Sequence, residues 1–118
     1  MPMLRKPVQL EWTLHAQVKM RQYRLSPARV RHVLHTPRRT EEGIAPKTIA
    51  MMQPSSMKTK DTWAQEIWVM IQDTAKARKV ISAWRYPGVT KPRGAVALGF
   101  LREQYEDFVN DAARRRKK

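Results

Sequence analysis

Three basic side chains of this sequence could together cleave RNA without a metal ion. His15 and Lys19 are four residues apart, a spacing that puts both on one face of a helix. Imidazole titrates near neutrality, so His15 could act as general base or acid while the 2′-hydroxyl attacks the neighbouring phosphorus. Arg85 could hold the phosphate through two parallel hydrogen bonds and stabilise its developing charge. We therefore predict His15, Lys19 and Arg85 as the catalytic residues.

Each of these residues also has a purely structural interpretation. His15 directly follows a strand pattern, so its imidazole could simply satisfy local backbone groups. Lys19 could be a solvated charge or a phosphate contact rather than an acid. Arg85 could form an ordinary ion pair on a sheet face, and Glu66 is a candidate partner for a cation on the neighbouring strand.

Further basic and aromatic residues are suited to binding a nucleic acid. Arginine dominates the basic residues of the first third of the chain, and its planar guanidinium matches the geometry of phosphate. Two aromatic residues beside Arg85 could stack on a base, although core packing is the favoured interpretation for at least one of them. The predicted nucleic-acid-binding residues are Arg21, Arg24, Arg29, Arg31, Arg38, Arg39, Trp84, Tyr86, Lys91 and Arg93.

The whole chain carries a large surplus of positive charge. Its 118 residues include 24 Lys and Arg against 10 Asp and Glu, which gives a formal net charge of +14. Residues 1–40 contain a single acid, Glu11, and residues 114–118 are all basic. A compact domain with this surplus repels itself, so the charge favours a polyanionic partner such as RNA or the ribosome.

Composition and motifs argue against several other classes of protein. The chain has no cysteine, so disulfides and cysteine-ligated metal centres are excluded. His32 and His35 have a spacing that can share a metal, but no nearby carboxylate completes a site, so we expect neither metal nor cofactor. No Gly-rich phosphate loop or nucleophile elbow occurs. The longest strongly apolar run, residues 67–71, is too short to span a bilayer, so we expect a cytoplasmic protein with no membrane partner.

Hydrophobic periodicity predicts the elements that would position these residues. It indicates strands at 9–14, 47–53, 63–72 and 79–86, a loop at 38–46, and helices at 15–25, 27–34 and from Leu98 onward. The strand at 63–72 is apolar on both faces, as expected of a central strand. Ser26-Pro27 is a typical helix start. The order β-α-α-β-β-β-α predicts an α+β fold, in which two N-terminal helices pack on a small antiparallel sheet and a C-terminal helix is added. We expect a flexible N-terminus at 1–8, a single domain at 9–113 and a basic tail at 114–118.

The segment from His15 to Ser26, HAQVKMRQYRLS, resembles the opening of a small bacterial domain family with the pattern H-A-x-x-R-M-x-x-R-x-I-S. That family is similar to the BrnT toxins and to the RelE/ParE-like ribonucleases. The strand at 80–86 also fits the family's final strand, so the resemblance covers about residues 9–86. It implies a RelE/BrnT-like fold and an RNA-directed site. Lys19 and Tyr23 stand where the pattern has arginines, which in the related toxins help to hold phosphate or base.

The sequence leaves three functions open. The first is a toxin-like protein that binds RNA, on or off the ribosome, and cleaves it as a metal-independent endoribonuclease. The second is a non-catalytic nucleic-acid- or ribosome-binding module that keeps the fold without the two arginines. The third is a structural protein whose apolar C-terminal helix docks on an acidic, antitoxin-like partner. That helix could equally close the domain's own core, which is the favoured use.

Overall fold

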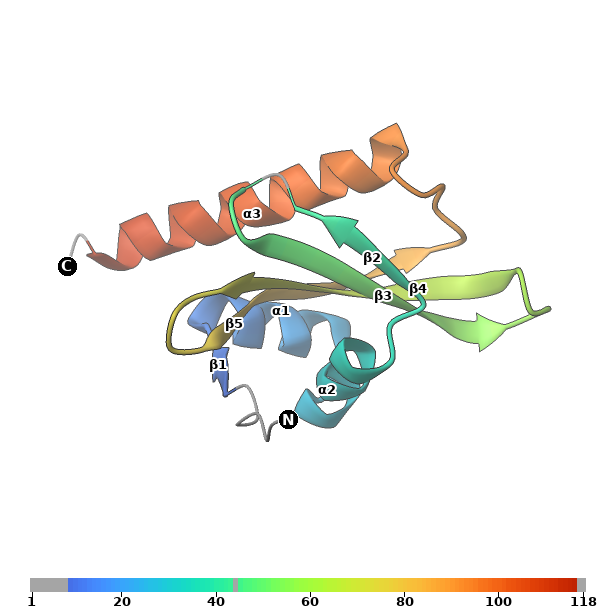
Figure 1. Ribbon diagram of the computed structural model, residues 1–118, viewed down its shortest axis with the longest axis horizontal. Helices are drawn as coiled ribbons and strands as arrows, with labels where there is room; N and C mark the ends of the chain where they lie inside the picture. The colour runs from blue at the N-terminus through green and yellow to red at the C-terminus, as the bar shows by residue number, and fades with distance from the viewer. Residues whose placement is uncertain (1–8, 44, 117–118) are drawn as a thin grey trace, which may run out of the picture.

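The computed structural model describes residues 9–43 and 45–116, which form three helices and a five-stranded sheet (Figure 1). The elements are β1 (Leu10–Trp12), α1 (Leu14–Tyr23), α2 (Pro27–His35), β2 (Arg39–Glu42), β3 (Thr48–Met57), β4 (Trp63–Asp73), β5 (Arg78–Pro87) and α3 (Ala95–Arg116). The predicted α+β class is confirmed. The segment 1–8, predicted to be flexible, lies outside the described residues.

The sheet has the strand order β1-β5-β4-β3-β2. Strands β2 to β5 form an antiparallel meander, as their short connections predict. β1 instead lies parallel to β5, with Leu10 opposite Arg78. The sheet is therefore mixed rather than purely antiparallel. The reason is that β1 and its partner β5 are separated by two helices and three strands, a connection long enough for a parallel crossover.

β2 lies in a segment that we expected to be a loop. Its sequence, RTEE, contains no apolar residue, so hydrophobic alternation does not reveal it. Glu41 is nevertheless 2% exposed, and it accepts a hydrogen bond from Nε of Arg39 at 3.0 Å. A buried ion pair thus takes the place of inward-facing apolar side chains at this edge of the sheet.

The β3–β4 hairpin is longer than the sequence indicated and reaches past the helices (Figure 1). β3 continues through Pro54, although we expected it to end at Gln53. Proline is tolerated there because β2 pairs only with residues up to Met52, so β3 is an edge strand beyond that point. The register skips Ser56, whose φ of 57° lies in the left-handed region.

α1 and α2 start where short polar side chains cap them. Oγ1 of Thr13 accepts a hydrogen bond from the amide of Ala16, and Oγ of Ser26 accepts one from the amide of Arg29. Pro27 takes the first position of α2, as predicted. α1 ends at Tyr23, and the φ of 56° at the following residue, Arg24, turns the chain toward α2.

The helices form layers on both faces of the sheet. α1 and α2 cover one face, where their apolar residues pack on Ile67, Val69 and Ile71 of β4. α3 covers the other face, where Leu101 packs among Trp68 and Met70 of the same strand. β4 is therefore the central strand that its apolar residues on both faces predicted, and α3 closes a core of its own domain.

α3 exceeds the predicted helix at both ends. It begins at Ala95, before Leu98, because Gly99 weakens a helix without preventing it. It continues to Arg116, so residues 114–116 of the predicted basic tail are helical, and 117–118 lie outside the described residues. Among the helices of the described part of the chain, none is long and apolar enough to span a bilayer.

Candidate nucleic-acid interface

His15 lies in the first turn of α1 and is only 4% exposed. Its Nδ1 is 2.5 Å from Oδ2 of Asp111 on α3, and its ring meets Phe108 edge-on at 6.2 Å between centroids. The other ring nitrogen, Nε2, is buried without a hydrogen-bond partner among the described residues. His15 thus connects two helices inside the molecule and presents no accessible nitrogen to a substrate.

Asp111 is a partner of His15 that the sequence did not reveal. The two residues are 96 positions apart, and no motif links them. The hydrogen bond with His15 lowers the pKa of the Asp111 carboxyl below its ordinary value, and the positive charge of Arg114 acts in the same direction. The carboxylate is therefore ionised at neutral pH and holds the imidazole in one orientation.

Arg85 lies at the opposite end of α1 from His15. Its Nε donates to the carbonyl of Tyr23 at 2.7 Å, and Nη2 donates to the carbonyl of Arg24 at 3.3 Å. A third bond joins Nη1 to Oε1 of Gln65 at 3.2 Å. Arg85 therefore caps the C-terminal carbonyls of α1.

The three predicted catalytic residues are not gathered at one point. His15 and Tyr23 are eight residues apart on α1, which corresponds to about 12 Å along the helix axis. Lys19 is half-buried midway between these ends. The structure thus places His15 and Arg85 at separate ends of one helix, and their catalytic role stays a prediction.

The two predicted base-stacking residues differ in accessibility. Trp84 is 1% exposed and stacks on Trp68, with 6.0 Å between centroids and 4° between planes. It belongs to the core and has no free face for a base. Tyr86 is half-buried, and its ring meets Phe100 edge-on at 5.1 Å.

We give the name basic helical face to the arginines of α1, of its C-cap and of α2: Arg21, Arg24, Arg29 and Arg31. Arg21, Arg24 and Arg31 are exposed, and Arg31 lies over the ring of Trp12 at 5.3 Å. Arg29 is half-buried, and its Nε has no partner among the described residues. The two helices lie side by side on one face of the sheet (Figure 1). Residues 12–40 include no Asp or Glu, so these helices contain no acid that could neutralise the arginines.

Arg38 and Arg39 are adjacent in sequence but differ in their surroundings. Arg38 is exposed, stacks over Trp63 at 5.1 Å and donates to the carbonyl of Lys60 at 2.9 Å. Its charge therefore lies beside the tip of the β3–β4 hairpin. Arg39 is largely buried between Glu41 and Thr90 and lies 5.2 Å above the ring of Trp68. Arg39 thus connects β2 to the loop that contains Thr90, and its guanidinium is not available to a phosphate.

Glu66 is the centre of a buried network that we did not predict. It is 0% exposed, and its two oxygens accept hydrogen bonds from the indoles of Trp63 and Trp68 and from both the amide and the hydroxyl of Thr90. The expected cation partner is not a direct neighbour, since Arg39 reaches Glu66 only through Thr90. The spacing Trp-x-x-Glu-x-Trp was the signal in the sequence that could have indicated it.

The loop between β5 and α3 carries the remaining predicted binding residues. Lys91 and Arg93 are both exposed. The amide of Arg93 donates to Glu41 at 3.1 Å, while Arg39 donates to the carbonyl and the hydroxyl of Thr90. These bonds attach the loop to β2 and thereby fix the backbone positions of Lys91 and Arg93.

Of the two histidines of α2, His32 makes a structural contact. Nδ1 of His32 is 3.1 Å from Oε1 of Gln53, and the amide of Gln53 donates to the carbonyls of His32 and Thr36. Gln53 thus attaches the end of α2 to β3. Within the described ranges, no group of three or more His, Asp or Glu side chains is arranged to hold a metal ion.

Comparisons of the chain with protein-family models, with curated proteins and with solved structures find no match. The resemblance to BrnT and RelE-like toxins therefore stays a prediction from the motif that begins at His15, and the residues described above carry the functional argument.

Proposed function

We propose that this protein binds RNA through the basic helical face, as a non-catalytic module. The observation that carries the proposal is that α1 and α2 contain cations and no acid, while the chain as a whole has a charge of +14. Arginines that contact phosphates release condensed counterions, so a face of this kind binds a polyanion strongly and in a salt-dependent way.

The distribution of ion pairs supports this role for the helices. The acids that form ion pairs with arginines in the described part of the chain do so elsewhere: Asp61 with Arg38, Glu41 with Arg39, Asp73 with Arg78, and Asp111 with Arg114. The arginines of the basic helical face take part in none of these pairs. The charges of the three exposed members, Arg21, Arg24 and Arg31, are therefore available to phosphates.

The positions of the predicted catalytic residues favour binding over cleavage. General acid–base catalysis needs a group within hydrogen-bond reach of the proton that it transfers. His15 is buried against Asp111, and Arg85 is bonded to backbone carbonyls at the other end of α1. Neither residue has a free polar group directed toward a common phosphate.

Binding can be tested by fluorescence anisotropy with a labelled single-stranded RNA at several salt concentrations. The variant R21Q/R24Q/R31Q removes three charges from the basic helical face. The matched control K47Q/K76Q/R102Q removes three exposed charges from two loops and from α3. The plot of log K against log salt has a negative slope. We expect the first variant to make this slope shallower by about 2, and the control to change it little. Equal loss in the two variants would refute the proposal.

The absence of cleavage can be tested with the same RNA in EDTA. We expect the RNA to stay intact with the wild-type protein. The variants H15A and R85A serve as comparisons. Cleavage by the wild type that disappears in both variants would contradict the non-catalytic role and establish the metal-independent endoribonuclease instead.

A further inference from the structure

A cavity of about 240 Å³ opens on the face of the sheet opposite to α1 and α2. It lies between the end of β5, the loop 88–94 and the first turns of α3, and it is lined by Tyr86, Val89, Thr90, Lys91, Val96 and Ala97. Its volume is below the roughly 300–1,000 Å³ of pockets that enclose a whole small molecule. The cavity therefore fits one ring of a larger ligand better than a complete free ligand.

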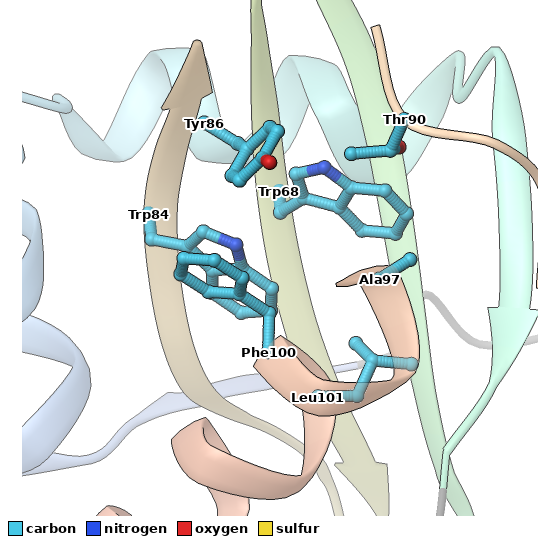
Figure 2. Close-up of a pocket in the computed structure, with 7 residues that line it drawn as sticks. All are labelled: Trp68, Trp84, Tyr86, Thr90, Ala97, Phe100 and Leu101. Carbon is cyan, nitrogen blue, oxygen red and sulfur yellow. The ribbon is translucent and has the colours of Figure 1, made fainter. Parts of the chain in front are cut away.

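Beneath this cavity is an aromatic floor. A narrow crevice of about 10 Å³ shares Tyr86, Thr90 and Ala97 with the cavity and is lined further by Trp68, Trp84, Phe100 and Leu101 (Figure 2). In Figure 2 the side chains of Tyr86 and Thr90 both lie next to the Trp68 indole. The crevice is too small for a ligand, so a bound ring would rest in the outer cavity, beside Tyr86.

The polar groups around the cavity are fixed before any ligand arrives. Thr90 donates its amide and hydroxyl to Glu66, and it accepts a hydrogen bond from Arg39 at 2.7 Å. Tyr86 is held edge-on against Phe100. A site built in this way loses little conformational entropy on binding, which favours affinity.

The charge around the opening is positive. Lys91 lines the cavity and Arg93 is exposed in the same loop. The nearby carboxylates, Glu41 and Glu66, are buried and hydrogen-bonded inside the network. A flat aromatic ring that is attached to an anionic backbone matches both the lining and the rim.

The cavity adjoins the basic helical face across the end of β5. Consecutive residues of a strand project to opposite faces of the sheet. Arg85 accordingly contacts the carbonyls of Tyr23 and Arg24 at the end of α1, while Tyr86 contacts Phe100 of α3. A flexible strand that follows the arginines of α1 could therefore turn over the end of β5 into the cavity.

From this placement we infer that the cavity receives one unpaired base of a single-stranded RNA whose phosphates lie on the basic helical face. The inference rests on the proposed function and narrows the RNA ligand to single strands. Every base offers a π-face, so stacking beside Tyr86 does not require a particular sequence. Bases in a duplex are already stacked and cannot enter.

Two valine variants on one helix test the inference. Val96 is 55% exposed at the cavity, and Val109 is 42% exposed farther along α3. V96E places a carboxylate in the cavity, where it repels the RNA, while an acid in the first turn of α3 does not harm the helix. V109E adds the same charge away from the cavity. We expect V96E to weaken binding of a labelled single-stranded RNA about tenfold relative to V109E, with no such difference for a duplex of the same sequence.

An abasic strand separates a base pocket from a general charge effect. For a single strand that consists of abasic sites alone, V96E and V109E should bind equally. Equal binding of the base-containing single strand by the two variants, together with a reduced salt slope in R21Q/R24Q/R31Q, would overturn the inference and leave the proposed function intact. A salt slope in R21Q/R24Q/R31Q that equals that of the wild type would instead refute the proposed function itself.

Discussion

Nδ1 of His15 lies 2.5 Å from Oδ2 of Asp111, and this hydrogen bond joins the N-terminus of α1 to the C-terminal half of α3. The two helices lie on opposite faces of the sheet, so the bond crosses the edge at β5. β1 pairs only with residues 78–80 of that strand. Tyr23 packs against both cores beyond this point, so α1 covers the rest of the edge. His15 and Asp111 thus help to close the sheet where strand pairing stops.

Asp111→Asn should destabilise the fold at neutral pH. We expect the free energy of unfolding to fall by about 1 kcal/mol, at the low end for a charged hydrogen bond because Asp111 is 24% exposed. Urea unfolding followed by tryptophan fluorescence measures this, with the exposed Glu106→Gln on the same helix as control.

The loss of stability caused by Asp111→Asn should depend on pH. The folded protein lowers the pKa of Asp111 below its ordinary value of 3.8. The stabilisation is therefore present above that value and is lost as the pH falls through the lower pKa of the folded state. The difference between wild type and D111N should shrink in this acidic range, and a difference that stays constant would show that the carboxylate charge does not matter.

Glu66→Gln should lower the free energy of unfolding more than Asp111→Asn does, because it replaces a carboxylate that is completely buried. One oxygen becomes an amide nitrogen, which cannot accept the two bonds, one from an indole and one from Thr90, that each Glu66 oxygen now receives. We expect a loss of about 3 kcal/mol, since buried donors are left unpaired. The exposed Glu103→Gln should change stability by less than about 0.5 kcal/mol. The midpoints of thermal unfolding of the two variants measure this difference. Similar midpoints would contradict a stabilising role for the hydrogen bonds of Glu66.

Arg85→Lys distinguishes a structural arginine from a phosphate ligand. Lysine keeps the charge but cannot reproduce the forked bonds to Tyr23 and Arg24. We expect the free energy of unfolding to fall by about 1–2 kcal/mol and the affinity for RNA to change by less than about twofold. Urea unfolding and anisotropy of the same preparation measure both. Unchanged stability together with much weaker RNA binding would instead indicate that Arg85 is a phosphate ligand.

Local patterns were sufficient for much of the fold. Ser26-Pro27 predicted the start of α2, and the apolar residues of 63–72 on both faces predicted a central strand. Each of these signals lies within one element. β2 was missed because its inward-facing residue is Glu41, whose burial depends on Arg39 and on the amide of Arg93 far along the chain.

The amino-acid sequence alone determined the charge of this protein, the class of its fold and the absence of acids between residues 12 and 40. Only the tertiary structure decided which cations and rings stay exposed at the surface. Arg21 and Arg39 are the same residue type, yet Arg21 is exposed whereas Arg39 is enclosed by Glu41 and Thr90. The physical reason is that a side chain's availability depends on the neighbours that folding brings to it, and those neighbours come from distant parts of the chain.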